Sequence, residues 1–297
     1  MFSAVSRFRR PPVEFAVGVA FERRFRIYTI NRRGLRFDTR FSPATAGSMD
    51  GVIVYLLLEG TMRWDDGLEL VGPALLVMRE RDFEGAEGMR TRGFRSWGEP
   101  FQTVELRIPA HECAVRLDGP ARVVPLDGDD DPVLAAGRLY LHASHATKGQ
   151  TRAAELAEVY LRGLQARGII VQDLASTMTL DEGLRGLLWD ALRPAIESFG
   201  GAKQEVVVSR VGWNGRRVQR ELTRMAVALG VGWIGSWRDV ALRYRVRFAA
   251  LLLSNATLSV GEIAEAVGYS SVEALAHAFE ACGLPPATEV RRLLAGE

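Results

Sequence analysis

The sequence has few of the residues that bind metals or form disulfides. Its 297 residues include only two cysteines, Cys113 and Cys282, and four histidines, the first of which is His111. Two cysteines in separate predicted domains exclude a disulfide framework and suit a reducing compartment, so we expect a cytoplasmic protein. A metal-dependent barrel enzyme needs several histidines and a carboxylate around one ion, and residues 1–110 contain no histidine. We therefore predict no metal, no cofactor and no catalytic residue.

Long apolar runs and the common enzyme motifs are also missing. The longest apolar run, Val52–Leu58, is too short to cross a bilayer, and no apolar segment follows the arginines at positions 7, 9 and 10. We therefore expect neither a secretory signal nor membrane contact. The sequence has no nucleophile elbow, P-loop or G-x-G-x-x-G segment, which argues against the enzyme classes that these motifs identify.

The first part of the chain has the pattern of a β-rich domain. Residues from about Val13 to Ile108 contain short apolar segments between glycine turns, with Asp66-Gly67 as a hairpin signal. The predicted strands are Val52–Leu58, Met62–Trp64, Leu68–Val71, Ala74–Met78 and Thr103–Ile108. Many short strands with glycine turns favour a sandwich or barrel. The rhythm of residues 56–78 is similar to that of a cupin domain, a β-barrel fold.

After Pro125 the pattern becomes helical. Val133–Ser144, with Pro132 suited to begin it, and Thr151–Arg167 are predicted amphipathic helices. On the second helix we expect one buried face, formed by Leu156, Val159, Tyr160 and Leu164. The pair either caps the barrel or forms a dimer interface. Leu180–Phe199 predicts a further helix, which Pro194 would bend.

Residues Leu258 to Arg292 predict a helix-turn-helix. Ser259 and Glu262 form a capping box, and Ile263, Ala264 and Val267 share one helix face before the turn at Gly268. We predict a second capping box from Ser270 and Glu273, followed by a helix with Leu275 and Phe279 in its core stripe. The N-terminal face of such a second helix can enter a major groove.

An earlier segment, Gln204 to Arg224, predicts a first unit of the same kind. Gly212-Trp213-Asn214 forms the turn, with Asn214 as the N-cap of the second helix. Val218 and Leu222 would pack inward, leaving an arginine-rich face outside. A helix from Trp237 to Ser254 would join the two units. The arginines on this helix either contact a DNA backbone or simply face solvent.

The C-terminal motif resembles the AraC/XylS family of bacterial transcription regulators. The residues that carry this resemblance are Arg245, Val246, Ala249, Leu252, Leu253, Ile263, Ala264, Val267, Gly268, Tyr269, Ser270, Ala278, Phe279, Gly283, Pro286 and Arg291. The resemblance covers about the last 95 residues. It implies an α+β protein: a cupin-like β-barrel sensor (residues 1–125), a helical dimerisation segment (126–180) and a DNA-binding domain (181–297) in which a long helix joins two helix-turn-helix units.

The resemblance also indicates which residues would contact DNA. On the first recognition helix, Arg216, Gln219 and Arg220 match base-facing positions, and Arg217 is placed to reach phosphate. Arginine can bind guanine, and glutamine adenine, through paired hydrogen bonds. On the second helix the matching residues are Ser270, Val272, Glu273 and His277. The alternative for the arginines of the first recognition helix is that they form the solvent-exposed face of an ordinary helix.

Charge divides the DNA-binding domain into two unequal parts. Residues 203–247 carry a net charge of +7, whereas residues 248–297 carry −4. We therefore expect the first unit to dominate DNA affinity. Residues 225–235 are an apolar insertion relative to the family, which either lengthens the recognition helix or packs against the sensor. Phe279 to Gly283 is one residue short of the family spacing.

The barrel interior is the expected site for a small-molecule effector. Tyr55 and Trp64 lie on predicted strands and either line such a pocket or pack in the core. Arginines are dense between positions 23 and 40, and one pointing inward would attract an anion. His142 and His145 are interpreted as an exposed pair on a helix.

Three functions fit these observations. The first is a ligand-responsive regulator whose partners are double-stranded promoter DNA, a small-molecule effector, a second copy of the chain and RNA polymerase. The second is a protein-interaction or antagonist module that uses the acidic second unit and the insertion at 225–235. A cupin enzyme is the third, and the missing metal ligands argue against it.

Overall fold

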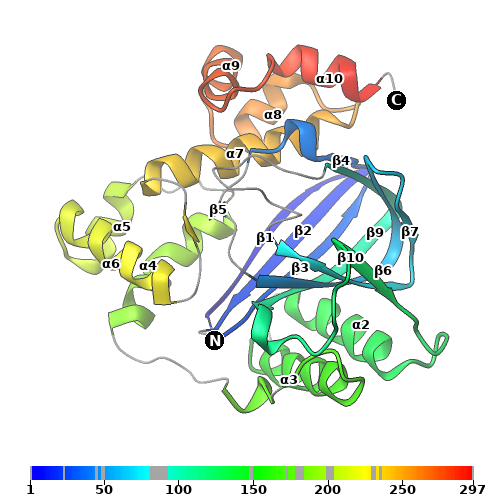
Figure 1. Cartoon of the computed structure of the whole chain (residues 1–297). Helices are drawn as coiled ribbons and strands as arrows, with labels where there is room; N and C mark the ends of the chain where they lie inside the picture. Colours follow the sequence, from blue (N-terminus) through cyan, green and yellow to red (C-terminus); the bar gives the residue numbers. More distant parts are fainter. Residues whose placement is uncertain are drawn as a thin grey trace.

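The computed structural model describes most of the chain as an α+β fold (Figure 1). The described residues are 2–22, 24–43, 46–47, 51–80, 93–146, 150–171, 173–177, 184–198, 204–228, 232–233 and 236–295. One large antiparallel sheet has helices on both faces, and a cluster of helices follows at the C-terminal end. Among the described residues, no helix has the length and apolar character needed to span a membrane.

The sheet is open rather than a closed barrel. Its described strand order is β1 (Phe2–Arg10), β2 (Val13–Phe21), β3 (Arg26–Arg33), β9 (Phe94–Pro109), β6 (Gly51–Trp64), β8 (Ala74–Arg79) and β10 (Ala121–Val124). The short strands β4 (Phe37–Asp38) and β7 (Glu69–Val71) pair with β9 and β6.

The expectation of a cupin-like barrel is therefore wrong with respect to closure. A barrel closes by pairing its outermost strands, and within the described chain β1 and β10 pair only with β2 and β8. Helix α4 (Leu184–Glu197) packs on β1 instead, where the Trp189 ring lies 5.6 Å from the Phe2 ring and 5.7 Å from the Phe21 ring. Strand β1 lies before the predicted β-rich region, although its buried residues alternate along the strand.

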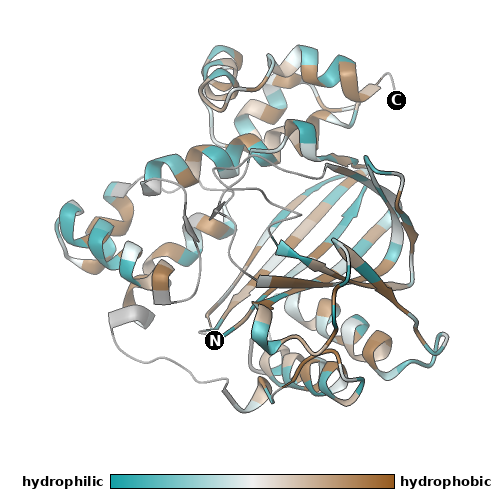
Figure 2. Ribbon diagram, in the orientation of Figure 1, coloured by the Kyte–Doolittle hydropathy of each residue, from teal (hydrophilic) through white to brown (hydrophobic). Residues whose placement is uncertain are grey.

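Alternation along the strands gives the sheet two different faces. Val54 and Leu56 of β6 and Leu106 of β9 belong to a core that includes α2 (Pro132–Ser144) and α3 (Gln150–Ala166). Ile53 and Leu57 lie on the opposite face, the inner face, toward α7. In Figure 2 the hydropathy colours alternate along several strands, whereas residues 52–58 of β6 are apolar on both faces.

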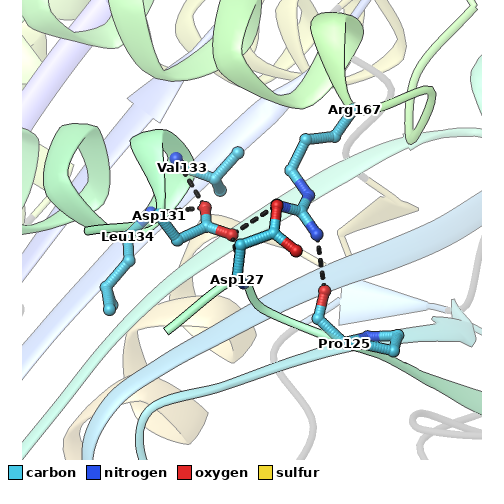
Figure 3. A network of polar contacts seen from close by, with 6 residues as sticks. All are labelled: Pro125, Asp127, Asp131, Val133, Leu134 and Arg167. Carbon is cyan, nitrogen blue, oxygen red and sulfur yellow. Dashed lines mark hydrogen bonds and ion pairs between the residues drawn. The ribbon is translucent and has the colours of Figure 1, made fainter. Parts of the chain in front are cut away.

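A polar network fixes the turn between β10 and α2 (Figure 3). Asp131 is buried and caps α2, accepting hydrogen bonds from the backbone N–H groups of Val133 (2.9 Å) and Leu134 (3.4 Å). Arg167, just after α3, pairs with Asp131 and with Asp127, and it also donates to the Pro125 carbonyl at 2.6 Å. Asp131 thus joins the start of one helix to the end of the next. Pro132 begins α2, as predicted.

Two side-chain predictions for α2 and α3 are wrong. On α3, Tyr160 and Leu164 are buried, but Val159 is 51% exposed because it faces outward from the sheet. His145 at the end of α2 is half-buried rather than exposed, and its Nε2 lies 3.0 Å from Thr29 Oγ1 of β3. Both errors arise because a helical pattern alone does not show which neighbouring strand covers the helix.

The C-terminal part consists of helices. They are α5 (Gln204–Val211), α6 (Gly215–Ala228), α7 (Trp237–Leu253), α8 (Val260–Ala266), α9 (Val272–Ala281) and α10 (Ala287–Ala295). Helix α4 contains Pro194 as predicted, and the predicted start of that helix at residues 180–183 lies outside the described residues. In Figure 1, α7 runs across the inner face of the sheet between α5–α6 and α8–α10.

Candidate nucleic-acid interface and ligand cavity

Helices α5 and α6 form the first helix-turn-helix unit. Gly212 adopts a φ of +68°, which suits the turn, and Asn214 Oδ1 accepts a hydrogen bond from the Arg217 backbone N–H at 2.9 Å. The predicted N-cap at Asn214 is thereby confirmed. Val218 and Leu222 are buried in a core that includes α4 and Phe2 of β1. The apolar face of α6 therefore points inward, and its polar face is left for solvent or a partner.

The arginines of α6 lie on that polar face. Arg216 and Arg217 are exposed, with the Arg217 guanidinium 4.5 Å from the centre of the Trp213 ring. Arg220 is 60% exposed, and its Nε donates to Glu221 Oε1 at 3.3 Å. Gln219 is half-buried. The arginine side chains thus remain accessible, although Glu221 neutralises part of the charge beside Arg220.

Helices α8 and α9 form the second unit, and one of its two predicted capping boxes is confirmed. Ser259 and Glu262 form the capping box at the start of α8, and Gly268 has a φ of +82° at the turn. The N-cap of α9 is Ser271 rather than Ser270, because the Ser271 Oγ accepts from the Ala274 backbone N–H at 3.2 Å. The predicted capping box of Ser270 with Glu273 is therefore wrong, since the cap lies one residue later and the third residue of the helix is Ala274.

The outer face of α9 is exposed but carries little positive charge. Ser270, Val272, Glu273 and His277 are all exposed. His277 Nδ1 lies 3.7 Å from Glu280 Oε2, and both side chains are more than 80% exposed. This helix offers neutral and acidic groups where α6 offers arginines.

The second unit is attached to the sheet. Asn255 Nδ2 donates to the Gly34 carbonyl at 2.7 Å, and the Arg36 backbone N–H donates to Ser254 Oγ at 2.9 Å. Arg10, at the end of β1, forms an ion pair with Glu262. Within the unit, Arg291 of α10 donates to the Leu258 carbonyl at 2.5 Å. The second unit therefore has polar contacts with the one end of strands β1 to β3 at which Arg10, Gly34 and Arg36 lie.

The described part of the 225–235 insertion does two things. Residues up to Ala228 extend α6, with Met225 and Ala226 buried. Gly232 and Trp233 (β11) then pair with Gly47 and Ala46 (β5, Ala46–Gly47) of the N-terminal region. Residues 229–231 and 234–235 lie outside the described residues.

A cavity of about 140 Å³ lies between the inner face of the sheet and α7. Eight of its 17 lining residues are aromatic, and four of the 17 come from α7. The lining residues are Phe15, Val17, Val19, Tyr28, Ile30, Arg32, Phe37, Tyr55, Phe94, Ser96, Phe101, Glu105, Arg107, Tyr244, Arg247, Phe248 and Leu251. The cavity is therefore a shared compartment, with a floor of strands and a wall from the helix that joins the two helix-turn-helix units.

Arg32 points into this cavity and is 2% exposed. Its Nη2 donates to Ser96 Oγ at 2.6 Å, and its guanidinium lies 4.0 Å from the centre of the Phe101 ring. Its Nε has no hydrogen-bond partner among the described residues, and none of their carboxylates pairs with it. Burial lowers the pKa of Arg32 to about 10, so the group is still charged near neutral pH.

The other buried charges nearby are paired. Glu80 accepts from Arg26 Nη2 at 3.1 Å and from Arg107 Nη1 at 2.9 Å, and Arg107 Nε also contacts Glu105. Two arginines and two carboxylates thus balance one another along the floor. Arg32 is the buried charge that this network does not compensate.

The two predicted ligand residues lie in different places. Tyr55 lines the cavity and is 2% exposed, and burial raises the pKa of its hydroxyl well above the usual value. Trp64 lies outside the cavity lining and packs in the core, with its ring 5.8 Å from the Phe94 ring. Arg32 itself was within the predicted arginine-rich segment, but the sequence offered no means of choosing it. Arg247 was expected to face solvent or DNA, yet it lines the cavity.

No cluster of three or more histidine, cysteine, aspartate or glutamate side chains placed to hold a metal ion occurs in the described ranges.

Comparison with known proteins gives structural likeness only. No protein-family model matches the chain, and no curated protein does. ToxT from Vibrio cholerae superposes with a TM-score of 0.34 at 9% identity, covering 90% of this chain and 96% of that one. The AraC-like transcriptional activator CuxR covers 99% of this chain and 86% of its own at 15% identity, with a TM-score of 0.22. The Streptomyces nucleoside dehydratase Pac13, in a structure with uridine, covers 41% of this chain and 86% of its own at 10% identity and a TM-score of 0.22. Superpositions this weak carry no argument about function.

Proposed function

We propose that this protein is a transcription regulator of the AraC/XylS type that binds double-stranded promoter DNA. One observation carries the proposal: α6 presents an exposed arginine face while its apolar face is buried against α4 and β1. Such a face suits the major groove, where arginine and glutamine read base edges. The motif that extends from Arg245 to Arg291 supports the same reading.

In this proposal α6 provides most of the affinity and α9 has a smaller share. Arg216, Gln219 and Arg220 read bases, and Arg217 contacts phosphate. Helix α7 has 17 residues and is about 26 Å long, so it can hold α6 and α9 within reach of successive major grooves. The acidic groups on α9 weaken its attraction to phosphate.

The cavity under α7 would be the effector site. A ligand there contacts strands on one side and Tyr244 and Phe248 of α7 on the other. It would therefore bind more tightly to one arrangement of α7 on the sheet than to another. That difference in affinity is what a ligand needs in order to change DNA binding.

A mobility-shift titration with promoter fragments tests DNA binding. We expect affinity to fall steeply between 50 and 200 mM salt, because basic side chains displace counterions from DNA (about 10³-fold or more for six phosphate contacts). Weak dependence on salt would instead favour the protein-interaction alternative and reject the proposal.

Three alanine variants test the ranking of the two units. Arg220→Ala should weaken binding at least tenfold, corresponding to about 1.4 kcal/mol. His277→Ala should change it less than threefold. Arg292→Ala, which removes one exposed charge from α10, is the matched control. A larger loss for His277→Ala than for Arg220→Ala would reverse the ranking.

The remaining parts of the proposal concern assembly and location. We propose a homodimer through the outer faces of α2 and α3, where Leu139 and Val159 are more than half exposed. Sedimentation of the wild type and of Val159→Glu tests this, since the charged variant should be monomeric. A regulator of this type would act on RNA polymerase in the cytoplasm.

A further inference from the structure

We propose that the cavity under α7 binds a single-ring aromatic carboxylate, with the carboxylate on Arg32 and the ring among the aromatic side chains. Its role as an effector rests on the proposed function above, whereas the binding itself does not. Charge, shape and wall chemistry each contribute to this inference.

The charge of the ligand follows from Arg32. A buried guanidinium without a counterion is costly, because its hydration is lost and nothing in the described chain replaces it. The Arg32 Nε is unsatisfied and the network of Glu80 and Glu105 is already shared by two other arginines. A carboxylate next to Arg32 would supply both the missing charge and the missing acceptor.

One negative charge suits the site better than two. Glu105 lines the same cavity and would repel a dianion. Arg107 is engaged with Glu80 and Glu105 and cannot balance a second charge without giving up those contacts. Arg247, the other arginine of the lining, is only half-buried, and its guanidinium lies 5.4 Å from the centre of the Phe37 ring. A monocarboxylate therefore fits where inorganic phosphate does not.

The shape of the ligand follows from the cavity volume. About 140 Å³ is close to the volume of apolar protein cavities that take up benzene (~150 Å³). A single six-membered ring fills that space, whereas a long acyl chain exceeds it.

The walls favour an aromatic ring over an aliphatic one. Phe101 and Tyr55 rise from the sheet, and Tyr244 and Phe248 come from α7. The Tyr244 and Phe248 rings meet edge to face at 4.5 Å, and the Phe248 and Phe15 rings do so at 5.1 Å. A planar ring between these side chains continues the same edge and offset contacts.

Calorimetric titration of the full-length protein with a series of small acids tests the proposal. Benzoate should bind at least tenfold more tightly than benzamide, which keeps the ring but lacks the charge. It should also bind at least tenfold more tightly than inorganic phosphate, which has the charge but no ring. Octanoate should bind more weakly than benzoate. Equal binding of benzamide, tighter binding of octanoate, or no binding of any aromatic acid would overturn the proposal.

Two variants locate the site. Arg32→Met should reduce benzoate affinity at least tenfold, and Leu251→Trp, which fills the cavity from α7, should do the same. Arg33→Met is the matched control, because Arg33 is the next residue on β3 and is exposed on the other face. Its benzoate affinity should stay within twofold of the wild type. Unchanged binding in both Arg32→Met and Leu251→Trp would show that benzoate binds elsewhere.

DNA and ligand are measured separately, so the two proposals can fail independently. If the protein binds benzoate but no DNA, the ligand-site proposal stands and the proposed regulatory function is rejected. If it binds DNA but no aromatic acid, the regulatory function stands and the ligand-site proposal is rejected.

Discussion

Replacing Arg32 by methionine should stabilise the ligand-free protein. The side chain is 2% exposed and has no carboxylate partner among the described residues, so the wild-type fold carries the desolvation cost of a buried cation, several kcal/mol. Two contacts offset part of that cost. They are the hydrogen bond to Ser96 at 2.6 Å, worth about 1.5–3 kcal/mol, and the position 4.0 Å from the Phe101 ring centre, worth up to ~2 kcal/mol.

The net change should be a gain of about 1–3 kcal/mol in the free energy of unfolding, because methionine has similar length and no charge to desolvate. Urea unfolding followed by circular dichroism measures it, without ligand and at neutral pH. Arg33→Met, on the same strand but exposed, should change stability by less than about 0.5 kcal/mol.

The difference in stability should narrow when benzoate is present. At a ligand concentration 100 times the wild-type dissociation constant, the wild type gains about 2.7 kcal/mol, whereas Arg32→Met, which binds at least tenfold more weakly, gains at most about 1.4 kcal/mol. If Arg32→Met loses 1 kcal/mol or more in the absence of ligand, the arginine is holding the fold together and our reasoning about an uncompensated charge is wrong.

Two further predictions concern the sheet and its helices. Burial lowers the pKa of His145 to about 4, whereas in an unfolded chain its pKa is near 6.5. The free energy of unfolding should therefore fall as the pH drops from 6.5 toward 4, by up to about 3 kcal/mol more in the wild type than in His145→Gln. Urea midpoints that change equally in the two proteins between pH 7 and pH 4.5 would contradict this. Asp131→Ala removes the N-cap of α2 and a partner of Arg167, so it should lower the free energy of unfolding in urea by about 2–4 kcal/mol. Asp129→Ala, at a side chain that is 85% exposed, should lower it by less than about 0.5 kcal/mol. Equal losses in the two variants would refute the role of the network.

Local signals in the sequence predicted the two helix-turn-helix units well. Capping boxes, glycine turns and apolar spacing depend on residues within one or two helical turns, and Asn214, Ser259 and Gly268 behave as those signals indicate. The error at Ser270 has the same local origin. Two serines stand side by side before α9, and the helix begins one residue later than the spacing to Glu273 suggested.

The cavity could not be predicted in the same way, because its parts come together only in three dimensions. Arg32 on β3, Ser96 on β9 and Phe248 on α7 are far apart in the sequence. Alternation on β3 does separate Arg32 from Arg33, but the sequence does not say which face of the strand is covered by a helix. Tyr55 and Trp64 are both buried strand aromatics, and only the position of α7 distinguishes the cavity residue from the core residue.

The open sheet has the same explanation. Short strands with glycine turns suit a closed barrel and an open curved sheet equally, since both need the same turns and the same alternation. The choice depends on what covers β1, and here that is α4, from a segment more than 170 residues away in the sequence.

Because α7 forms one wall of a compartment whose other walls are strands, dividing the chain for expression would damage both pieces. A fragment that ends before Trp237 would retain Phe15, Tyr55 and Phe101 but leave these rings open to water. A fragment that begins at Gln204 would retain α5–α10 but expose Phe248 and Leu251, which are 6% and 5% exposed in the whole chain. Both truncated products should therefore be prone to aggregation, and biochemical work on either half is best done in the intact polypeptide with point substitutions.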